Sequence, residues 1–297
     1  MTLLLAHLTD AHIGPLPRVL RRELMSKRIT GYINFKVGRD RVHDMDVLAR
    51  LVSDMLAHRP DHVAMTGDIL NIGLQAEFPL ARAWLETLGH PEQVSFAPGN
   101  HDAYIRSTLA HLMQTFAPYC RDDGAAENVR SHFPYVRVRQ GVALIGLSTG
   151  VPTAPFIASG RLGKEQIAAL AGALARAKEQ GLARVIMMHH PPVKAAARGL
   201  TDVRAFEAVL RQHGADLVLH GHNHSASVHY LEGPKGQAIP FIGAPSASLV
   251  RGRFRAAYHL YRIAAKSDGS VEIHGHSRGL QAGTLEIGDL GAISIRK

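Results

Sequence analysis

His-Val-Ala-Met-Thr-Gly-Asp-Ile-Leu-Asn, residues 62–71, joins an apolar run to a turn that carries an aspartate and an asparagine. The run His62–Thr66 has the length of a strand and does not alternate with polar residues, which is typical of a strand covered on both faces. Gly67 follows at once, and Asp68 and Asn71 then offer oxygen donors where the strand ends. In open α/β sheets, functional side chains gather in the loops just past the carboxyl ends of strands. The stretch therefore predicts a buried strand followed by a functional loop.

Four other apolar runs are followed by donor residues in the same way. The runs are Leu3–Leu8, Val94–Ala97, Arg184–Met188 and Asp216–Leu219. The blocks that follow them are Asp10-Ala-His12, Pro98-Gly-Asn100-His101-Asp102, His189-His190-Pro-Pro192 and His220-Gly-His222-Asn-His224. One such block could arise by chance, but oxygen and imidazole donors behind five strands are hard to produce by accident. We therefore predict a metal site at the strand ends.

Helical periodicity between these runs indicates a layered α/β domain. Apolar residues recur every three or four positions at Met45, Leu48, Val52 and Met55, at Ile167, Leu170, Leu174 and Ala177, and at Val203, Phe206 and Leu210 behind a predicted Thr201 cap. Further strands are predicted at Val142–Leu147, Val228–Leu231, Ile239–Ile242, Tyr258–Ile263 and Val271–His274. The last four follow one another without helices, which predicts an antiparallel end. Because no linker or repeat divides the chain, we expect one domain over residues 1–297.

Composition excludes several classes of protein. The 297 residues are 46% hydrophobic and 20% charged, which argues against disorder. The single Cys120 rules out a disulfide scaffold and suits a reducing compartment. There is no apolar run of 18 residues and no signal peptide pattern, so we expect a cytoplasmic protein. The net charge of +9 favours acidic partners but does not choose among them.

The segment of residues 13–43, which we call the insertion, interrupts this rhythm. Basic residues alternate there with apolar ones, and they are Arg18, Arg21, Arg22, Lys27, Arg28, Lys36, Arg39 and Arg41. One interpretation is a solvated helical excursion that covers the sheet edge or a subunit contact. The other is that Arg21, Arg22 and Arg28 overhang the site and bind an anionic or amphiphilic substrate, with the apolar residues meeting acyl chains or an interface.

The five blocks resemble the signature of the calcineurin-like metallophosphoesterase superfamily, D-x-H, G-D-x-x-[ND], G-N-H-[DE], a further His and G-H-x-H. They occur in that order from Asp10 to His224. The His-His-Pro-Pro block and the chain length are most similar to the class III cyclic-nucleotide phosphodiesterase and glycerophosphodiesterase group. The resemblance implies a four-layer αββα sandwich with a dinuclear metal site at the carboxyl ends of the strands.

The resemblance also implies a ligand set. Asp68 would bridge two divalent cations; Asp10, His12 and His224 would complete one set, and Asn100, His189 and His222 the other. Nitrogen and oxygen donors without thiolate suit Mn, Fe, Co or Zn. Of the adjacent pair, the resemblance favours His189 as the ligand and leaves His190 either to support a ligand or to contact the substrate.

The expected chemistry is hydrolysis by a metal-bridged hydroxide. His101 resembles the family histidine that contacts the phosphate and protonates the leaving oxygen. Asn71 stands where phosphoprotein phosphatases have an acid that orients this histidine, and it could still orient the ring. Asp102 could supply an alternative orienting group or could simply hold its loop.

Several functions remain open at this stage. The leading one is hydrolysis of a small organic phosphodiester, with cyclic nucleotides or glycerophosphodiesters as the classes the resemblance implies. A pyrophosphatase acting on a nucleotide-linked lipid precursor would suit the insertion, and a nuclease ranks third because no aromatic stacking run is present. A non-catalytic scaffold that kept the fold is the alternative from another class, although every ligand position holds a competent residue. Homodimer formation and peripheral lipid contact are left open.

Overall fold

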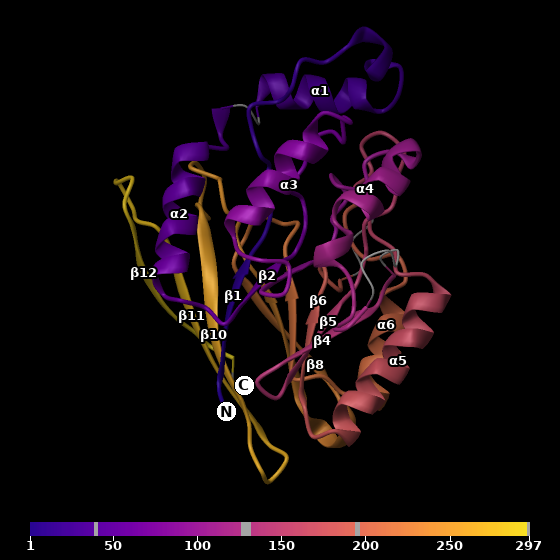
Figure 1. Cartoon of the computed structure of the whole chain (residues 1–297), viewed down its shortest axis with the longest axis vertical. Coiled ribbons are helices and arrows are strands. Elements are labelled where there is room, and N and C mark those ends of the chain that lie inside the picture. Colours follow the sequence, from indigo (N-terminus) through magenta and orange to yellow (C-terminus); the bar gives the residue numbers. More distant parts are fainter. Residues whose placement is uncertain (39–40, 126–131, 194–196, 296–297) are drawn as a thin grey trace.

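A computed structural model describes residues 1–38, 41–125, 132–193 and 197–295. Within these ranges two six-stranded sheets pack against each other around a shared apolar core (Figure 1). The order in the first sheet is β12 (Ile287–Ile293), β11 (Val271–Leu280), β10 (Ala257–Ala265), β1 (Leu3–Leu8), β2 (His62–Met65) and β3 (Val94–Phe96). The order in the second sheet is β4 (Tyr135–Arg139), β5 (Val142–Gly146), β6 (Ala183–Met187), β7 (Leu217–His220), β9 (Ala238–Gly243) and β8 (Ser227–Glu232).

Helices cover the outer faces of both sheets, which confirms the four-layer αββα sandwich. On the side of the first sheet lie α2 (Met45–Ala57), α3 (Glu77–Thr87) and α4 (Leu109–Thr115). On the side of the second sheet lie α5 (Lys164–Glu179) and α6 (Val203–His213). The insertion contributes α1 (Arg28–Val37), and the short 3₁₀ turns are η1 (Arg21–Leu24), η3 (Arg106–Thr108), η4 (Ala117–Tyr119) and η5 (Pro234–Gly236).

The central strands are buried on both faces, as their unbroken apolar runs predict. In β6, Val185 and Met187 join the core between the sheets. Ile186, and Met188 just past the strand end, pack with the apolar residues of α5 and α6. Successive side chains on a strand point to opposite faces, so a strand between two apolar layers needs apolar residues at every position.

The helix expectations hold for the buried faces but fail for one cap. Asp44 caps α2 by accepting hydrogen bonds from the backbone N–H groups of residues 46 and 47. The predicted Thr201 cap of α6 is wrong, because Thr201 Oγ1 donates to the Gly160 carbonyl, 3.0 Å away. Asp202 stands at the cap position without a capping hydrogen bond and instead accepts from the backbone N–H groups of Leu162 and Gly163 before α5. Tertiary contacts therefore take both side chains that could have capped α6.

Parallel pairing places the functional loops at one end of the sandwich. In the first sheet β1 pairs with β2 and β2 with β3, all parallel. In the second sheet β5, β6, β7 and β9 are parallel neighbours. The loops after β1, β2, β3, β6 and β7 therefore leave from the same end.

The carboxyl-terminal part is antiparallel, as expected, but it is shared between the sheets. Strands β10, β11 and β12 extend the first sheet from β1, and β8 pairs with β9 at the edge of the second. The strands β4 and β12 have no counterpart in the sequence prediction, because the Arg and Gly residues within them interrupt an apolar pattern. In the described ranges no helix is long and apolar enough to cross a membrane.

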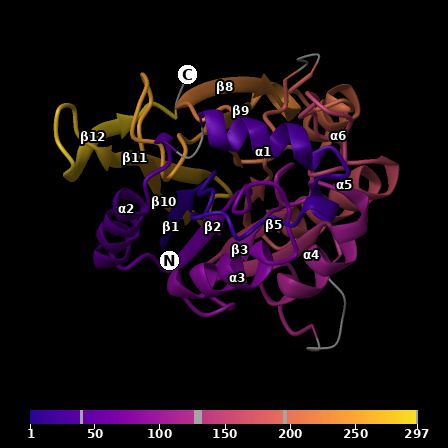
Figure 2. The ribbon, with the colours of Figure 1, turned by 90° about the horizontal axis from the view of Figure 1, so that it is seen from above.

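The insertion lies across the end of the sandwich that carries the functional loops (Figure 2). Its residues Leu16, Val19 and Tyr32 pack on an apolar cluster formed by Ile72 and Tyr104. These two belong to the loops after β2 and β3, so the insertion covers the loops rather than a sheet edge. Arg39, one of its predicted basic residues, lies outside the described residues.

Candidate dinuclear metal centre

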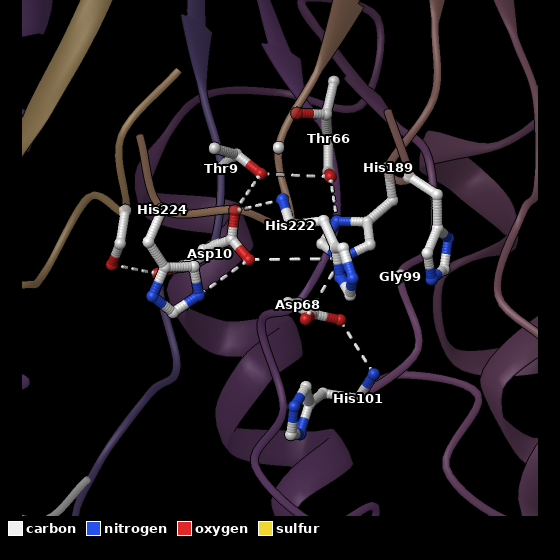
Figure 3. Close-up of polar contacts among 12 residues, drawn as sticks. Thr9, Asp10, Thr66, Asp68, Gly99, His101, His189, His222 and His224 are labelled. Carbon is white, nitrogen blue, oxygen red and sulfur yellow. Dashed lines mark hydrogen bonds and ion pairs between the residues drawn. The ribbon is translucent and has the colours of Figure 1, made fainter. Parts of the chain in front are cut away.

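Two groups of donor side chains meet at the strand ends (Figure 3). Within each group, one donor atom from every residue lies within 4.8 Å of the others. The first group consists of Asp10, His12 and His224, and the second of Asp68, His189 and His222. These are six of the seven side chains that the sequence predicts as ligands, and they divide into the predicted sets.

The two groups adjoin through their carboxylates. His189 Nε2 lies 3.1 Å from Asp68 Oδ2 and 4.0 Å from Asp10 Oδ1. His224 Nε2 lies 3.2 Å from Asp10 Oδ1 on the other side. Both carboxylates are buried, and a buried carboxylate needs positive partners. The arrangement fits a pair of cations held side by side.

Buried donor atoms without hydrogen-bond partners support this fit. Among the described residues, Asp10 Oδ1, Asn100 Oδ1, His189 Nε2 and His222 Nε2 are buried and accept or donate no hydrogen bond. A buried polar atom left unmatched costs about 1–3 kcal/mol. Asp10 Oδ1 and His189 Nε2 have only the ion-pair contacts given above, and Asn100 Oδ1 and His222 Nε2 lie unmatched beside them, so a bound cation fits as their common partner. Asn100, the seventh predicted ligand, joins the set through this atom. The donors suit a borderline divalent cation such as Mn, Fe, Co or Zn.

Backbone hydrogen bonds fix which ring nitrogen faces the site. His189 Nδ1 lies 2.7 Å from the Thr66 carbonyl, and His12 Nδ1 lies 3.1 Å from the Leu70 carbonyl. Each Nδ1–H donates to a carbonyl, and Nε2 is then the ligand atom. Thr9 Oγ1 and the His222 backbone N–H both donate to Asp10 Oδ2, at 2.8 and 2.9 Å, so Oδ1 is the oxygen directed to the site.

The backbone at the ligands is strained. Asp10, His12, Asp68, His222 and His224 have φ between 44° and 70°, in the left-handed region. Residues other than glycine adopt it at a cost of about 1–3 kcal/mol each. This conformation turns the chain sharply at the strand end. The strain is thus concentrated at the donors themselves.

The glycines of the motifs are required by close packing around the carboxylates. A Cβ atom on Gly99 would collide with Asp68 Oδ1, and one on Gly221 would collide with Thr9 Oγ1 and Asp10 Oδ2. The G-N-H and G-H patterns therefore have a steric reason.

The electrostatics of the site favour bound positive charge. Burial opposes ionisation of Asp68, but His189 and then His101 hold its pKa well below the usual range. Burial likewise opposes a charge on His189, yet Asp68 and Asp10 raise its pKa to about 9. Burial and then His189 lower the pKa of His222 to about 4, which keeps that ring neutral, and the positive charge that the two carboxylates draw to His189 is the charge that a bound cation would supply instead.

His101 is oriented by a backbone group and not by the Asn71 side chain. Its Nδ1 hydrogen-bonds the Asn71 carbonyl oxygen, and its backbone N–H donates to Asp68 Oδ1 at 2.8 Å. Asn71 Nδ2 donates instead to the Ile13 carbonyl, 2.8 Å away. The residue named from the sequence is therefore involved, but through a different atom.

Asp102 holds its loop, which is the second of the two roles that the sequence leaves open. Its carboxylate accepts four backbone N–H groups, from Asp68, Ile69, Leu70 and Gly99, at 2.7–3.1 Å. Burial and the neighbouring Asp68 raise its pKa to about 6, so it is ionised at neutral pH. It joins the loop after β2 to the loop after β3.

The structure favours the supporting role for His190 over substrate contact, and it corrects the substrate role expected for Arg28. His190 is buried, with Nδ1 2.8 Å from Thr149 Oγ1 and Nε2 3.1 Å from the Ala158 carbonyl, so its ring packs against His222 and both nitrogens are occupied. Arg28 is only 7% exposed. Its Nε donates to the Ile72 carbonyl at 3.1 Å, and it also donates to the Gly73 carbonyl. It anchors the insertion, whereas Arg21 and Arg22 are exposed on η1.

Some histidines outside the motifs also take defined places. His43 belongs to the insertion, and its ring centroid lies 4.8 Å from that of His12 and 5.8 Å from that of His224. None of the five sequence blocks includes His43. Its position at the end of the insertion, where the chain returns to the metal centre, is the only sequence signal for it. His220 is the last residue of β7, and His274 and His276 pair with acids at the surface of β11.

A two-sheet sandwich with two adjoining imidazole–carboxylate groups at the strand ends fits a metal-dependent hydrolase. Residues 3–226 match the family described as calcineurin-like phosphoesterase, and the chain belongs to this family. It is therefore a phosphoesterase, and two divalent cations are the cofactors that its residues fit.

Similar proteins agree with this assignment. The glycerophosphodiester phosphodiesterase GpdQ of Enterobacter lignolyticus (strain SCF1) is 26% identical over 233 residues, covering 76% of this chain and 72% of its own length. The probable cyclic nucleotide phosphodiesterase syc0937_d of Synechococcus sp. is 28% identical over 256 residues, covering 84% and 82%. These two belong to the group that the sequence resembles. Purple acid phosphatase PPD1 from yellow lupin seeds shares the fold, with a TM-score of 0.60 and 11% identity over 97% of this chain and 53% of that one.

Proposed function

We propose that this chain hydrolyses a small organic phosphodiester, of the cyclic nucleotide or glycerophosphodiester class. The observation that carries the proposal is the pair of donor groups that adjoin through Asp10, His189 and Asp68, with His101 fixed beside them. The names of the two sequence relatives support a diester. The donor set supports Mn, Fe, Co or Zn as cofactor.

Two cations bound at this centre would supply an acidified water and would neutralise charge on the phosphate. The chain's own residues then position the reactants. Asp10, Asp68 and the imidazoles would hold the cations at the strand ends, and the cations would in turn bind the phosphate there. His101 Nδ1 hydrogen-bonds the Asn71 carbonyl, which supports the proposal that Nε2 of the protonated ring delivers its proton to the leaving oxygen and that the ring is left neutral with its proton on Nδ1.

A substrate panel tests the proposal. Protein reconstituted with Mn²⁺ would be assayed on bis-p-nitrophenyl phosphate and on p-nitrophenyl phosphate, and then on 2′,3′- and 3′,5′-cyclic nucleotides and glycerophosphodiesters. We expect a higher kcat/KM for at least one diester than for the monoester. Asp68→Ala serves as the inactive control. A preference for the monoester over every diester would contradict the proposal.

The insertion favours a second candidate, a pyrophosphatase acting on a nucleotide-linked lipid. Met25, Ile29, Ile33 and Val37 recur every four residues and are 86%, 49%, 52% and 73% exposed. Such an apolar stripe beside basic residues fits an acyl chain or an anionic lipid surface. The substrate role expected for Arg21 and Arg22 belongs to this candidate.

A nucleotide-linked lipid added to the panel decides between the two candidates. If the lipid is the substrate, Ile33→Ser and the double variant Arg21→Ala, Arg22→Ala raise its KM and leave bis-p-nitrophenyl phosphate unaffected. Exposed Leu80→Ser on α3 is the matched control. Equal KM values for all variants would remove this candidate.

A further inference from the structure

Lys27 is held by the insertion above the loops of the metal centre. Its Nζ donates to Thr153 Oγ1 at 3.0 Å and lies 4.4 Å from the centroid of the Tyr104 ring. Thr153 belongs to the segment after β5, and Tyr104 to the loop after β3. Three segments far apart in the sequence thus place this ammonium group.

Neighbouring contacts keep Lys27 in place. Arg28, the next residue, is pinned to the carbonyls of Ile72 and Gly73. One turn later Gly31 packs so closely on the Tyr104 hydroxyl that a Cβ atom there would collide with it. The start of α1 is therefore seated on the loops, unlike the exposed Lys36 near its other end.

A short series of contacts joins Lys27 to the reacting centre. The Tyr104 ring stacks on the His101 ring, with centroids 5.6 Å apart and planes 29° apart. The His101 backbone N–H donates to Asp68 Oδ1. Burial lowers the pKa of Lys27, while the negative charge of Asp68 raises it. The positive charge of Lys27 therefore interacts with the negative charge of Asp68.

Within the described residues the Lys27 ammonium group contacts two neutral groups, the Thr153 hydroxyl and the Tyr104 ring face. A partly buried ammonium group gains most from an anionic oxygen that replaces lost water. Lys27 and His101 both contact the Tyr104 ring, and His101 is the residue proposed to protonate the leaving oxygen, so that anionic oxygen would belong to the part of the substrate that leaves.

We propose that Lys27 and Thr153 form a subsite for a second anionic group, a carboxylate or phosphate, carried by the leaving alcohol of the phosphodiester. This inference rests on the proposed phosphodiesterase function and narrows it. Substrates with such a group bind more tightly than those whose only charge is the diester. Lys27 is then a specificity-determining residue that the sequence motifs do not contain.

Two isosteric diesters test the subsite, methyl 3-carboxyphenyl phosphate and methyl 3-carbamoylphenyl phosphate, which differ in the charge of the leaving group. We expect Lys27→Met to raise KM for the carboxylate about tenfold, the effect of one partly exposed charge contact, and to change KM for the amide less than about twofold. Lys27→Arg should retain the preference, and Lys36→Met should change neither KM. Lys27→Gln provides a second variant if Lys27→Met does not fold, as judged by its thermal midpoint.

The outcomes separate the two claims. If the wild-type protein hydrolyses both diesters and Lys27→Met alters both KM values equally or not at all, the subsite is wrong and the phosphodiesterase proposal stands. If the wild-type protein hydrolyses neither diester nor bis-p-nitrophenyl phosphate, the phosphodiesterase proposal fails and the subsite falls with it.

Discussion

Asp102→Asn should be far more damaging than its small change in shape suggests. Each carboxylate oxygen accepts two backbone N–H groups, Oδ1 from Ile69 and Leu70 and Oδ2 from Asp68 and Gly99. In asparagine one oxygen becomes an NH₂ group, which donates and cannot accept. Whichever way the amide turns, two buried N–H groups lose their acceptor and face another donor.

The expected loss follows from these contacts. Two unmatched N–H groups cost about 2–6 kcal/mol together. Removing the charge returns part of the cost of burying it, because burial is what raises the pKa of Asp102 to about 6. We therefore expect the free energy of unfolding to fall by about 3 kcal/mol, a large share of the stability of a typical domain. Because Asp102 joins the loops that carry Asp68 and Asn100, metal affinity should also fall, by about 10–100-fold.

Urea unfolding at pH 7 with EDTA, followed by circular dichroism, measures the stability without bound cations. Asp46→Asn, an exposed carboxylate in the first turn of α2, is the control and should change the free energy of unfolding by less than about 0.5 kcal/mol. Isothermal titration with Mn²⁺ measures the affinity. An Asp102→Asn protein within about 1 kcal/mol of wild type would refute the argument from the four hydrogen bonds.

Three further predictions concern the site and its support. Asp68→Ala and His222→Ala should each lower kcat at least about 10³-fold and reduce the Mn²⁺ stoichiometry with the circular dichroism spectrum unchanged; full activity of either would remove that residue from the centre. Arg28→Ala should lower the free energy of unfolding by about 2–3 kcal/mol in urea because it leaves buried carbonyls without a donor, and an unchanged midpoint would show that the insertion is anchored elsewhere. Burial opposes ionisation of Asp54, but hydrogen bonds from Arg278 hold its pKa below the ordinary 3.8, so its contribution is present above that pH and lost as pH falls below it. Wild type should therefore lose about 1 kcal/mol more than Asp54→Asn between pH 5 and pH 2 in urea titrations, and parallel curves would contradict this.

The contrast between β6 and α6 shows how far local pattern reaches. In β6 the apolar residues Val185 and Ile186 face two different apolar layers. The unbroken apolar run was therefore enough to predict a strand covered on both sides. At α6 the sequence also predicted the buried face correctly. It failed at the cap, because Thr201 and Asp202 hydrogen-bond to residues 160–163, about forty positions away. The capping preference of a residue type does not indicate whether its side chain will hydrogen-bond to a residue that is distant in the sequence.

The sequence by itself determined the layered α/β class, and it predicted the strand ends as the place of the site and the side chains that gather there. It could do so because the apolar run of a strand and the donor residues that follow it are both short, contiguous stretches of sequence. Only the tertiary structure decided which atom does what: the Asn71 carbonyl and not its side chain orients His101, and Arg28 anchors the insertion. It also placed Lys27 against the Tyr104 ring and His43 beside His12. These assignments depend on hydrogen-bond geometry and packing between segments that are remote in the chain, and no local pattern encodes them.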